Sequence, residues 1–451
     1  MRRLALSTLL LSICLSGTAW PAQVQRGKSL PRAGFLGVQT AAVEGGKGVR
    51  VVRIVPGGSG EALGLKADDV LLSLNGTVLA TQQQLNIAIR AVRGGDALKI
   101  AYVRAGKEAA AGGKMIARPI PSEPGLDVIF DQVLSRGNRV RVMITKPKGP
   151  GRFPTLFFIG GIGAYSMDGA LSSSFYGKVL GPVSQAGYVT VRIDKPGIGD
   201  SEGPEYKNLG FGEEKDAYLQ ALRLTKTLEY VDPDRIAIFG HSMGGCFGPL
   251  VAAEEPVKAL LVTGTLYKTF GEYMLENTRR QAELGGAAPD GLDQTLRQCL
   301  TAMHYLFDEG LTPKQASEEH PETASWIKGN FPDGETYSGV GFGFWRELAN
   351  TNLAKAWSGT NADVLAIYSE NDFLSGRDDH ERIAAAMNRK RAGSGEFRLL
   401  EGTDHIWSKT TSMRDSQEKW GKASEFNPSI VETVLDYLKR KLRGEGREDP
   451  E

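Results

Sequence analysis

The chain has 451 residues, of which 41% are hydrophobic and 24% are charged, and its formal net charge is +1. This is the composition of an ordinary globular protein, and the length allows two or three domains. The balanced charge provides neither the basic excess of a nucleic-acid-binding protein nor an acidic tail, so we expect no nucleic-acid partner.

The first twenty residues, MRRLALSTLLLSICLSGTAW, have the pattern of a secretory signal. Two arginines are followed by an apolar run and then by small residues. Gly17 and Ala19 fit the small positions before a cleavage site, so residues 1–19 are predicted to be removed. We therefore expect a periplasmic or secreted protein without an integral membrane segment after cleavage. An uncleaved anchor is the alternative, although the apolar run is short for a spanning helix.

Cysteines occur at positions 14, 246 and 299, and the first lies in the predicted signal. The other two could pair in an oxidising compartment. Cys246 follows a glycine-rich turn, where a small buried apolar side chain is expected. That position favours two unpaired thiols.

Residues 34–118 have the pattern of a small β-rich domain. Short runs of β-forming residues are separated by Pro-Gly-Gly, Asn-Gly and Gly-Gly turns, and a helical run spans residues 82–92. The stretches FLGV, IVPGGSGEALGL, DDVLLSLNG and VRAGKE resemble a PDZ domain of bacterial type. The family usually has Gly-Asp where the residues at 67–69 read Ala-Asp-Asp.

This resemblance implies a groove for a protein C-terminus. Backbone N–H groups at Phe35, Leu36 and Gly37 would hold the terminal carboxylate, and the peptide would add as a strand beside the helix at 82–92. One hypothesis is that the groove presents a peptide substrate to the next domain or gates its site. The alternative is a PDZ fold used only for packing.

A proline-rich segment, ARPIPSEPG, follows this domain. Proline at such density is extended and semi-rigid. We therefore place a linker at residues 119–125.

Residues 126–443 alternate between strand and helix patterns. LDVIFDQV and NRVRVMITKP predict an antiparallel pair, and TLFFIGG, YVTVRID, RIAIFG, ALLVTGT and DVLAIYS are apolar runs typical of parallel strands covered on both faces. The pattern predicts an α/β fold with a doubly wound, mostly parallel sheet. Residues 266–362 predict a helical cap inserted into it. Its aromatic residues either line an apolar pocket or form the core of the cap itself: Tyr305, Phe307, Trp326, Phe342, Phe344 and Trp345.

The stretch IAIFGHSMGG places Ser242 in a G-x-S-x-G turn between a predicted strand and a predicted helix. Such a turn is a nucleophile elbow, which exposes a serine at the end of a strand. A serine hydroxyl needs a base to react. Asp372 follows the strand DVLAIYS, and His405 follows the run FRLLEG, so acid and base come after the serine in the order expected.

Two other acids and four other histidines are less suited to these roles. Glu370 and Asp404 are the alternative acids. The histidines at 241, 304, 320 and 380 are expected to be surface or structural residues, with the first supporting the elbow.

Together with RIDKPGIGDSEGP at residues 192–204, these motifs resemble the α/β-hydrolase superfamily, especially bacterial esterases and serine aminopeptidases. The resemblance implies a Ser-His-Asp hydrolase without cofactor or metal. It implies an oxyanion hole built from the amide of Met243 and a donor from the loop in LFFIGGIGAYSMDG, with Gly160, Gly161 and Ile162 as candidates.

The expected substrate is a carboxylic ester. A peptidase is the first alternative, in which Glu318, Glu319 and Glu322 of the cap would bind a free amino terminus. A binding protein that uses the hydrolase fold only as a scaffold is the second.

Overall fold

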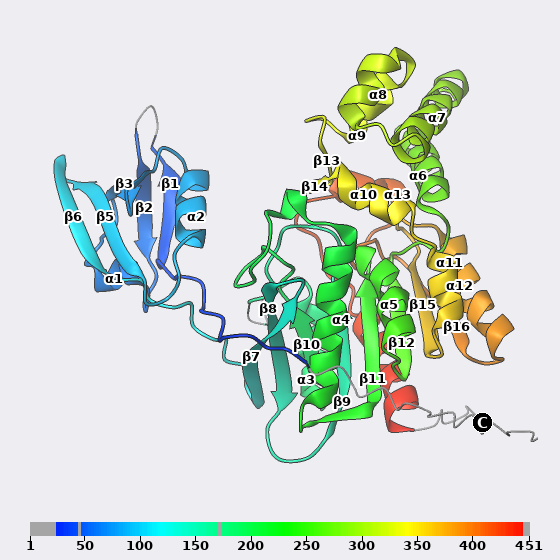
Figure 1. Ribbon diagram of the computed structural model, residues 1–451, viewed down its shortest axis with the longest axis horizontal. Helices are drawn as coiled ribbons and strands as arrows, with labels where there is room; N and C mark the ends of the chain where they lie inside the picture. The colour runs from blue at the N-terminus through cyan, green and yellow to red at the C-terminus, as the bar shows by residue number, and fades with distance from the viewer. Residues whose placement is uncertain (1–23, 44–46, 170, 172–173, 445–451) are drawn as a thin grey trace, which may run out of the picture.

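The computed structural model describes residues 24–43, 47–169, 171 and 174–444, and the predicted secretory signal lies outside this part. These residues form a small β-rich domain and a larger α/β domain, joined by two chain segments (Figure 1). Within the described ranges, no helix combines the length and apolar character needed to span a bilayer.

The small domain is a sheet with strand order β1-β2-β3-β5-β6, with β4 beside β3. Its elements are β1 (Val38–Ala42), β2 (Val49–Ile54), α1 (Ser59–Ala62), β3 (Val70–Leu74), β4 (Thr77–Val78), α2 (Gln82–Arg90), β5 (Ala97–Arg104) and β6 (Lys107–Lys114). Helix α2 buries Leu85 and Ala88 in the domain core. Thr81 and Gln84 form a capping box that fixes where α2 begins.

The large domain is built on an eight-stranded sheet with strand order β16-β15-β12-β11-β9-β10-β8-β7. Strands β7, β8 and β10 pair antiparallel, and the other pairs are parallel. The strands are β7 (Leu126–Ser135), β8 (Asn138–Pro147), β9 (Phe153–Ile159), β10 (Val189–Ile193), β11 (Val231–His241), β12 (Ala259–Thr263), β15 (Asp363–Ser369) and β16 (Gly395–Leu400). The predicted doubly wound, mostly parallel sheet is confirmed.

Helices cover both faces of this sheet. Along β9, Leu156 and Phe158 pack with α3 (Gly177–Gln185) and α14 (Ser429–Leu438) on one face. Phe157 and Ile159 belong to the core of the opposite face. That second core includes side chains of α4 (Phe211–Thr227), α5 (Met243–Glu254) and α12 (Arg377–Lys390). A strand buried on both faces needs apolar side chains at every position, which explains the continuous runs in the sequence.

The predicted cap lies between β12 and β15 (yellow-green to yellow in Figure 1). It contains α6 (Phe270–Leu284), α7 (Pro289–Met303), η2 (His304–Asp308), α8 (Pro313–Glu319), η3 (Pro321–Thr323), α9 (Ala324–Asn330), β13 (Thr336–Tyr337), β14 (Val340–Gly341), α10 (Phe342–Ala349) and α11 (Leu353–Gly359). The cap aromatics named from the sequence pack in a hydrophobic core that the cap shares with α4 and α5, where Phe344 contacts Phe211 and Phe247. The remaining short elements are η1 (Tyr206–Asn208), α13 (Met413–Lys419) and η4 (Lys439–Arg443).

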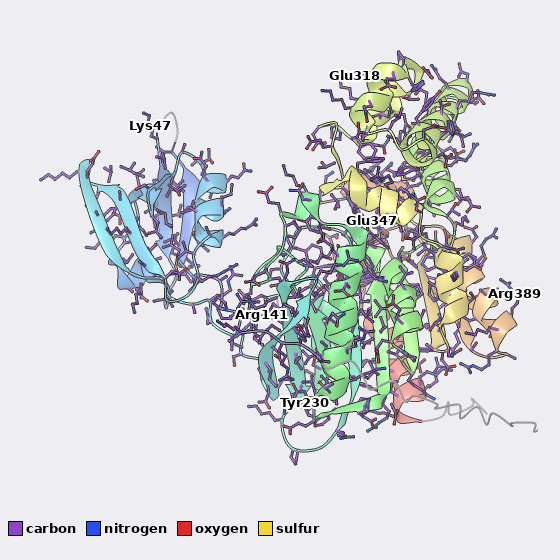
Figure 2. All side chains as sticks on the ribbon, in the orientation of Figure 1. Lys47, Arg141, Tyr230, Glu318, Glu347 and Arg389 are labelled. Atoms are coloured by element: carbon purple, nitrogen blue, oxygen red, sulfur yellow. The ribbon has the colours of Figure 1, made fainter. Side chains whose placement is uncertain are left out.

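Residues 24–33 lie against the large domain before the chain enters the small one. The amide of Leu134 donates to the carbonyl of Gln25 (2.8 Å). At the other end of this segment, the guanidinium of Arg32 contacts the carboxylate of Asp200 (2.7 Å) and that of Asp168 (2.8 Å). The sequence did not predict this contact. Arg141, which also binds Asp200 (3.1 Å), marks the side of the large domain nearest the small one (Figure 2).

Cys246 in α5 and Cys299 in α7 are buried, unpaired thiols, as their sequence positions favoured. Burial raises the pKa of each thiol to about 11. Both therefore stay protonated at neutral pH, and a protonated thiol is a poor nucleophile.

Candidate active site

The G-x-S-x-G motif forms a tight turn between β11 and α5. Ser242 has φ 56° and ψ −124°, a backbone conformation that a residue with a side chain rarely adopts. A Cβ on Gly240 would lie 2.4 Å from the carbonyl oxygen of Gly244, and one on Gly244 would lie 2.1 Å from that of Ile159. Only glycine fits at both positions, so the motif is required by the turn.

The structure brings together the three residues that the sequence singled out for catalysis. Ser242 Oγ lies 3.0 Å from His405 Nε2, and His405 Nδ1 lies 2.8 Å from Asp372 Oδ2. Asp372 follows β15 and His405 follows β16, so two neighbouring strands deliver the acid and the base to the same end of the sheet. Both side chains are buried.

Asp372 is held as a carboxylate. It accepts hydrogen bonds from the amides of Leu374 (2.8 Å) and Ser375 (3.0 Å) and from the hydroxyl of Ser375 (2.5 Å). Burial by itself would raise the pKa of Asp372, but the charge and hydrogen bond of His405 and the bonds from Ser375 hold it well below its usual range. Burial likewise opposes the charged form of His405, but Asp372 raises the pKa of that ring above its usual value.

The two alternative acids do not contact the His405 ring. Glu370 is exposed and accepts from the amide of Gly402 (2.7 Å). Asp404 accepts from the amides of Ile406 (3.0 Å) and Ser408 (2.6 Å). Asp372 is the acid that the geometry places against the base.

His241 links the serine turn to the loop that carries His405. Its Nε2 lies 2.9 Å from the carbonyl oxygen of His405, which can only accept, so Nε2 carries the proton. Its Nδ1, 2.9 Å from the Tyr176 hydroxyl, therefore accepts from that hydroxyl. Burial lowers the pKa of His241 to about 3, which keeps the ring neutral. This residue supports the site without titrating near neutral pH.

The other three histidines are away from the serine. His380 lies in α12, donating from Nδ1 to the carbonyl of Gly376 (2.8 Å) and accepting at Nε2 from the amide of Thr265 (3.3 Å). His304 and His320 lie in the cap, the first exposed and the second stacked on Tyr305.

The loop after β9 lies against the serine, and its peptide groups are firmly oriented. A Cβ on Gly161 would lie 3.0 Å from the Cβ of Ser242. The amide of Gly161 donates to the hydroxyl of Tyr176 (2.9 Å). The carbonyl of Gly161 accepts from the hydroxyl of Tyr165 (2.6 Å) and from Lys195 Nζ (2.7 Å).

This arrangement distinguishes two of the loop donors predicted from the sequence, Gly161 and Ile162. The amide of Gly161 already has an acceptor, whereas that of Ile162 has none among the described residues. The peptide that joins them is trans, so the N–H of Ile162 points opposite to the fixed carbonyl of Gly161. Met243 is the first residue of α5, where a helical N–H has no acceptor within the helix.

Lys195 reaches the loop from a fully buried position. Its ammonium pairs with the carboxylate of Glu214 (3.0 Å), and both side chains are at most 3% exposed. Burial opposes the charge on Lys195, but Glu214 more than offsets this, so the pKa of Lys195 is raised. Sequence reasoning missed this residue although it lies within the RIDKPGIGDSEGP motif, because its role depends on contacts with Gly161 and Glu214 that are distant in the chain. Tyr165 and Tyr176 carry no sequence pattern that marks them.

A cavity of about 530 Å³ opens beside Ser242. Its lining comes mainly from the segment between β9 and α3, and α3 itself and the loops that carry Asp372 and His405 add further residues. The cap contributes one described residue to it, Ser338. The lining residues are Gly161, Ile162, Tyr165, Ser166, Met167, Leu171, Ser174, Phe175, Tyr176, Leu180, Arg192, His241, Ser242, Ser338, Leu374, His405, Ile406 and Trp420.

None of the lining residues that the structure describes is an aspartate or a glutamate. Glu318, Glu319 and Glu322, which were considered for binding a free amino terminus, are exposed on the cap. Figure 2 shows Glu318 on α8, at the outer end of the cap.

One group of acids in the described residues has the spacing of a cation site, Glu276, Asp378 and Asp379. The ammonium of Lys268 lies among them, in contact with Glu276, 2.7 Å from Asp378 and 3.9 Å from Asp379. The protein therefore supplies the positive charge at this position itself.

In the small domain, the three residues of the predicted carboxylate-binding loop differ in their bonding. The amide of Phe35 donates to the carbonyl of Ile116 (2.8 Å). The amides of Leu36 and Gly37 have no acceptor in the described residues. Strand β1 is at the edge of the sheet, so a peptide could add beside it. At the start of α2, Gln82 bonds to the carbonyl of Thr40 in β1 (2.5 Å).

The family model for the alpha/beta hydrolase fold matches residues 154–406, and that for the PDZ domain matches residues 34–112. Both resemblances inferred from the sequence are confirmed. Esterase EstD of Thermotoga maritima is 25% identical over 155 residues, 34% of this chain and 36% of that protein. Uncharacterized peptidase YtmA of Bacillus subtilis is 32% identical over 122 residues, 27% and 44% of the respective chains. Each match thus spans less than half of the relative.

Among solved structures, alpha/beta hydrolase GrgF from Penicillium sp. sh18 is similar to this chain with a TM-score of 0.44 and 16% sequence identity. The similarity covers 70% of this chain and 100% of that one.

Proposed function

The chain belongs to the alpha/beta hydrolase family, and from this premise we propose that it is a serine esterase that cleaves carboxylic esters through an acyl-enzyme. The observation that carries the proposal is the continuous hydrogen-bonded chain from Asp372 through His405 to Ser242. A base and an acid arranged in this way activate a serine hydroxyl for attack on an acyl carbon.

In the first half of the reaction, Ser242 Oγ attacks the ester carbonyl while His405 Nε2 takes its proton. Asp372 orients the ring and stabilises the imidazolium that forms. The amides of Met243 and Ile162 donate to the oxygen that becomes negative, and the positive end of α5 adds to this stabilisation. His405 then gives its proton to the alcohol as it leaves.

In the second half, water replaces the alcohol. His405 takes a proton from the water as it attacks the acyl group on Ser242. The tetrahedral intermediate uses the same two amides and breaks down to the free acid, while His405 returns its proton to Ser242 Oγ. A binding protein on an inactive scaffold would not require the serine, the base and the acid to be in register, so their alignment favours an enzyme.

The lining of the cavity favours an ester over a peptide with a free amino terminus. Recognition of an ammonium group in a closed site needs a carboxylate, and none lines the described cavity. The peptidase remains the second candidate, supported by the similarity to YtmA.

We also propose that the mature protein acts in the periplasm or outside the cell, and that the small domain binds a protein C-terminus. The first proposal is based on the pattern of residues 1–19. The second is based on the PDZ match, the free amides of Leu36 and Gly37, and the edge position of β1. N-terminal sequencing of the exported protein and fluorescence anisotropy with a library of free and amidated C-terminal peptides test them separately.

The esterase is tested with a panel of neutral p-nitrophenyl esters and aminoacyl p-nitroanilides. The wild type should cleave esters. Ser242→Ala should lower kcat by more than about a thousandfold, because Ser242, His405 and Asp372 act as a unit. Ser358→Ala, at an exposed serine of α11, is the matched control and should keep full activity. Equal rates for the Ser242→Ala variant and the wild type would disprove the mechanism, and a preference for the anilides would indicate the peptidase.

A further inference from the structure

The cavity beside Ser242 also contains a buried arginine that the proposed chemistry does not use. Arg192 lies in β10 and is 1% exposed. Its Nε donates to the carbonyl of Met167 (3.2 Å), and its Nη1 donates to the hydroxyl of Thr145 (3.1 Å). Both acceptors are uncharged. The remaining nitrogen, Nη2, has no acceptor among the described residues.

No described carboxylate lies within 4 Å of this guanidinium. Asp194, Asp168 and Glu123 interact with it electrostatically at longer range. Each is bonded elsewhere. Asp194 accepts from Ser166 and the amide of Met167, Asp168 pairs with Arg32, and Glu123 accepts from the amide of Leu171.

An arginine without a direct ion pair is unusual in a protein interior, because burying a charge is unfavourable unless a counter-charge and hydrogen bonds compensate. Burial lowers the pKa of Arg192 to about 10, so the group remains a cation at neutral pH. The Nη2 group of an arginine that lines this cavity is therefore a site for an anion.

The walls of the cavity are suited to a chain that joins such an anion to an ester. Besides Ser242 and Arg192, the same cavity is lined by apolar side chains, including Leu171, Leu180 and Phe175. An ester whose carbonyl is at Ser242 would extend along these apolar side chains. A charged group of the substrate that lay against them would lose its hydration and gain no counter-charge. A charge placed beside Arg192 would meet the guanidinium.

We propose that the substrate is an ester that carries a free carboxylate at the end remote from the bond that is cleaved, and that Arg192 binds this carboxylate. This inference rests on the proposed esterase. A planar guanidinium binds a carboxylate with two parallel hydrogen bonds, which fixes its orientation as well as its charge. The carboxylate belongs either to the acyl part, as in a half-ester of a dicarboxylic acid, or to the alcohol part.

The test compares p-nitrophenyl half-esters of dicarboxylic acids, from succinic to suberic, with neutral p-nitrophenyl esters of the same chain length. A second series has a neutral acyl group and a carboxylated phenol. The wild type should show a kcat/KM at least tenfold higher for the carboxylated member of one series, with a maximum at one chain length. That series identifies the part of the substrate that carries the charge.

Arg192→Met keeps the length of the side chain and removes the charge. It should abolish the preference for carboxylated esters, lowering kcat/KM at least tenfold more for them than for neutral esters, because the buried polar contact is lost only for the charged substrate. Arg192→Lys should retain part of the preference, since it keeps the charge and loses the planar fork. Retained cleavage of neutral esters shows that each variant is folded.

Three results would contradict the inference. If the wild type cleaves neutral esters without preferring carboxylated ones, Arg192 binds no substrate anion, while the esterase stands. If Arg192→Met lowers kcat/KM equally for carboxylated and neutral esters, Arg192 is only a structural residue. If no ester is cleaved, the esterase itself fails. Calorimetric titration of wild type and Arg192→Met with glutarate and adipate then tests whether Arg192 binds an anion. No binding by the wild type, or equal binding by both proteins, would exclude an anion site at Arg192.

Discussion

The geometry of Ser242 depends on neighbouring glycines, which have no side chain. Gly244 packs so closely on the carbonyl of Ile159 that no side chain fits between them. The strained φ of Ser242 persists because the strand before it and the helix after it leave the turn no other path. The position of the hydroxyl is therefore set by the backbone on both sides of the serine.

Gly244→Ala should destabilise the protein by about 1–3 kcal/mol, because the added methyl group overpacks a buried turn. Differential scanning calorimetry measures this change. Gly329→Ala is the matched control, since a Cβ at that position in α9 meets nothing within 4 Å. That variant should be neutral or slightly stabilising, since alanine is the better helix former. An unfolding temperature equally unaffected in both variants would show that the turn tolerates a side chain.

The pKa of His405 sets the low-pH limit of the proposed reaction, because the ring accepts the serine proton only when it is neutral. Asp372 raises this pKa, so kcat/KM should be low in acid and rise with pH to a plateau, with a midpoint above the usual pKa of a histidine. His241 adds no step in this range, since its pKa is about 3.

Asp372→Asn should shift that midpoint downward and lower kcat by roughly 10⁴-fold, because the ring loses its counter-charge and its orienting acceptor. Profiles of kcat/KM against pH on one neutral ester test both effects. Glu370→Gln, the other acid near the end of β15, should leave the profile unchanged. If Glu370→Gln shifts the midpoint and lowers kcat while Asp372→Asn does neither, Glu370 is the acid that orients His405.

Lys195 is a positioning residue in the proposed mechanism, because it holds the carbonyl of Gly161 and thereby aims the amide of Ile162. Lys195→Met should lower kcat by about 10–100-fold with little change in KM, because the oxyanion donor matters mainly in the transition state. Steady-state kinetics on a neutral ester separate the two constants.

The variant also leaves Glu214 buried without a partner, which is destabilising. The double variant Lys195→Met, Glu214→Gln should regain stability in thermal unfolding while kcat stays low. If kcat recovers together with stability, Lys195 acts only through the fold.

Elements with a strong local pattern were predictable, and those defined by distant partners were not. The apolar runs that became β9, β11, β12 and β15 predicted a sheet buried on both faces, and the loops after β15 and β16 held the expected acid and base. Tyr176 and Lys195 could not be found in this way. Their roles depend on contacts with Gly161, 15 and 34 residues away in the chain, which no periodicity encodes.

The cap shows the same limit. Its aromatic residues suggested either a pocket wall or a core, and hydrophobicity alone does not distinguish the two. In the folded chain they belong to the hydrophobic core that the cap shares with α4 and α5, and the catalytic cavity is lined instead by the loop after β9 and its neighbours. The path of the backbone determines which of these side chains face the cavity and which face the core.

The arrangement of the two domains depends on a few charged contacts at their junction. Arg32 binds Asp200 and Asp168, both buried, and the amide of Ala33 donates to Asp200 (2.6 Å). Asp200 in turn lies in the loop that follows β10. Partly buried ion pairs of this kind restrict motion more than exposed ones do.

Arg32→Met should release the small domain without changing the chemistry. Small-angle X-ray scattering should show a larger radius of gyration, and limited proteolysis should cut faster within residues 119–125, while kcat on a neutral ester stays within about twofold. Arg50→Met removes an exposed pair with Asp68 inside the small domain and should change none of these measurements, as surface pairs contribute little. An unaltered radius for Arg32→Met would show that other contacts hold the domains.

The segment at residues 24–33 changes how the chain is divided. Because it lies on the large domain, that domain is discontinuous in sequence, and the PDZ fold is an insertion within it. The amide of Arg118 donates to the carbonyl of Ala33 (2.8 Å), so the two ends of the insertion already meet. An excision that joins residue 33 to residue 118 by a short loop should leave an intact hydrolase. A truncation from the N-terminus would strip a piece from it.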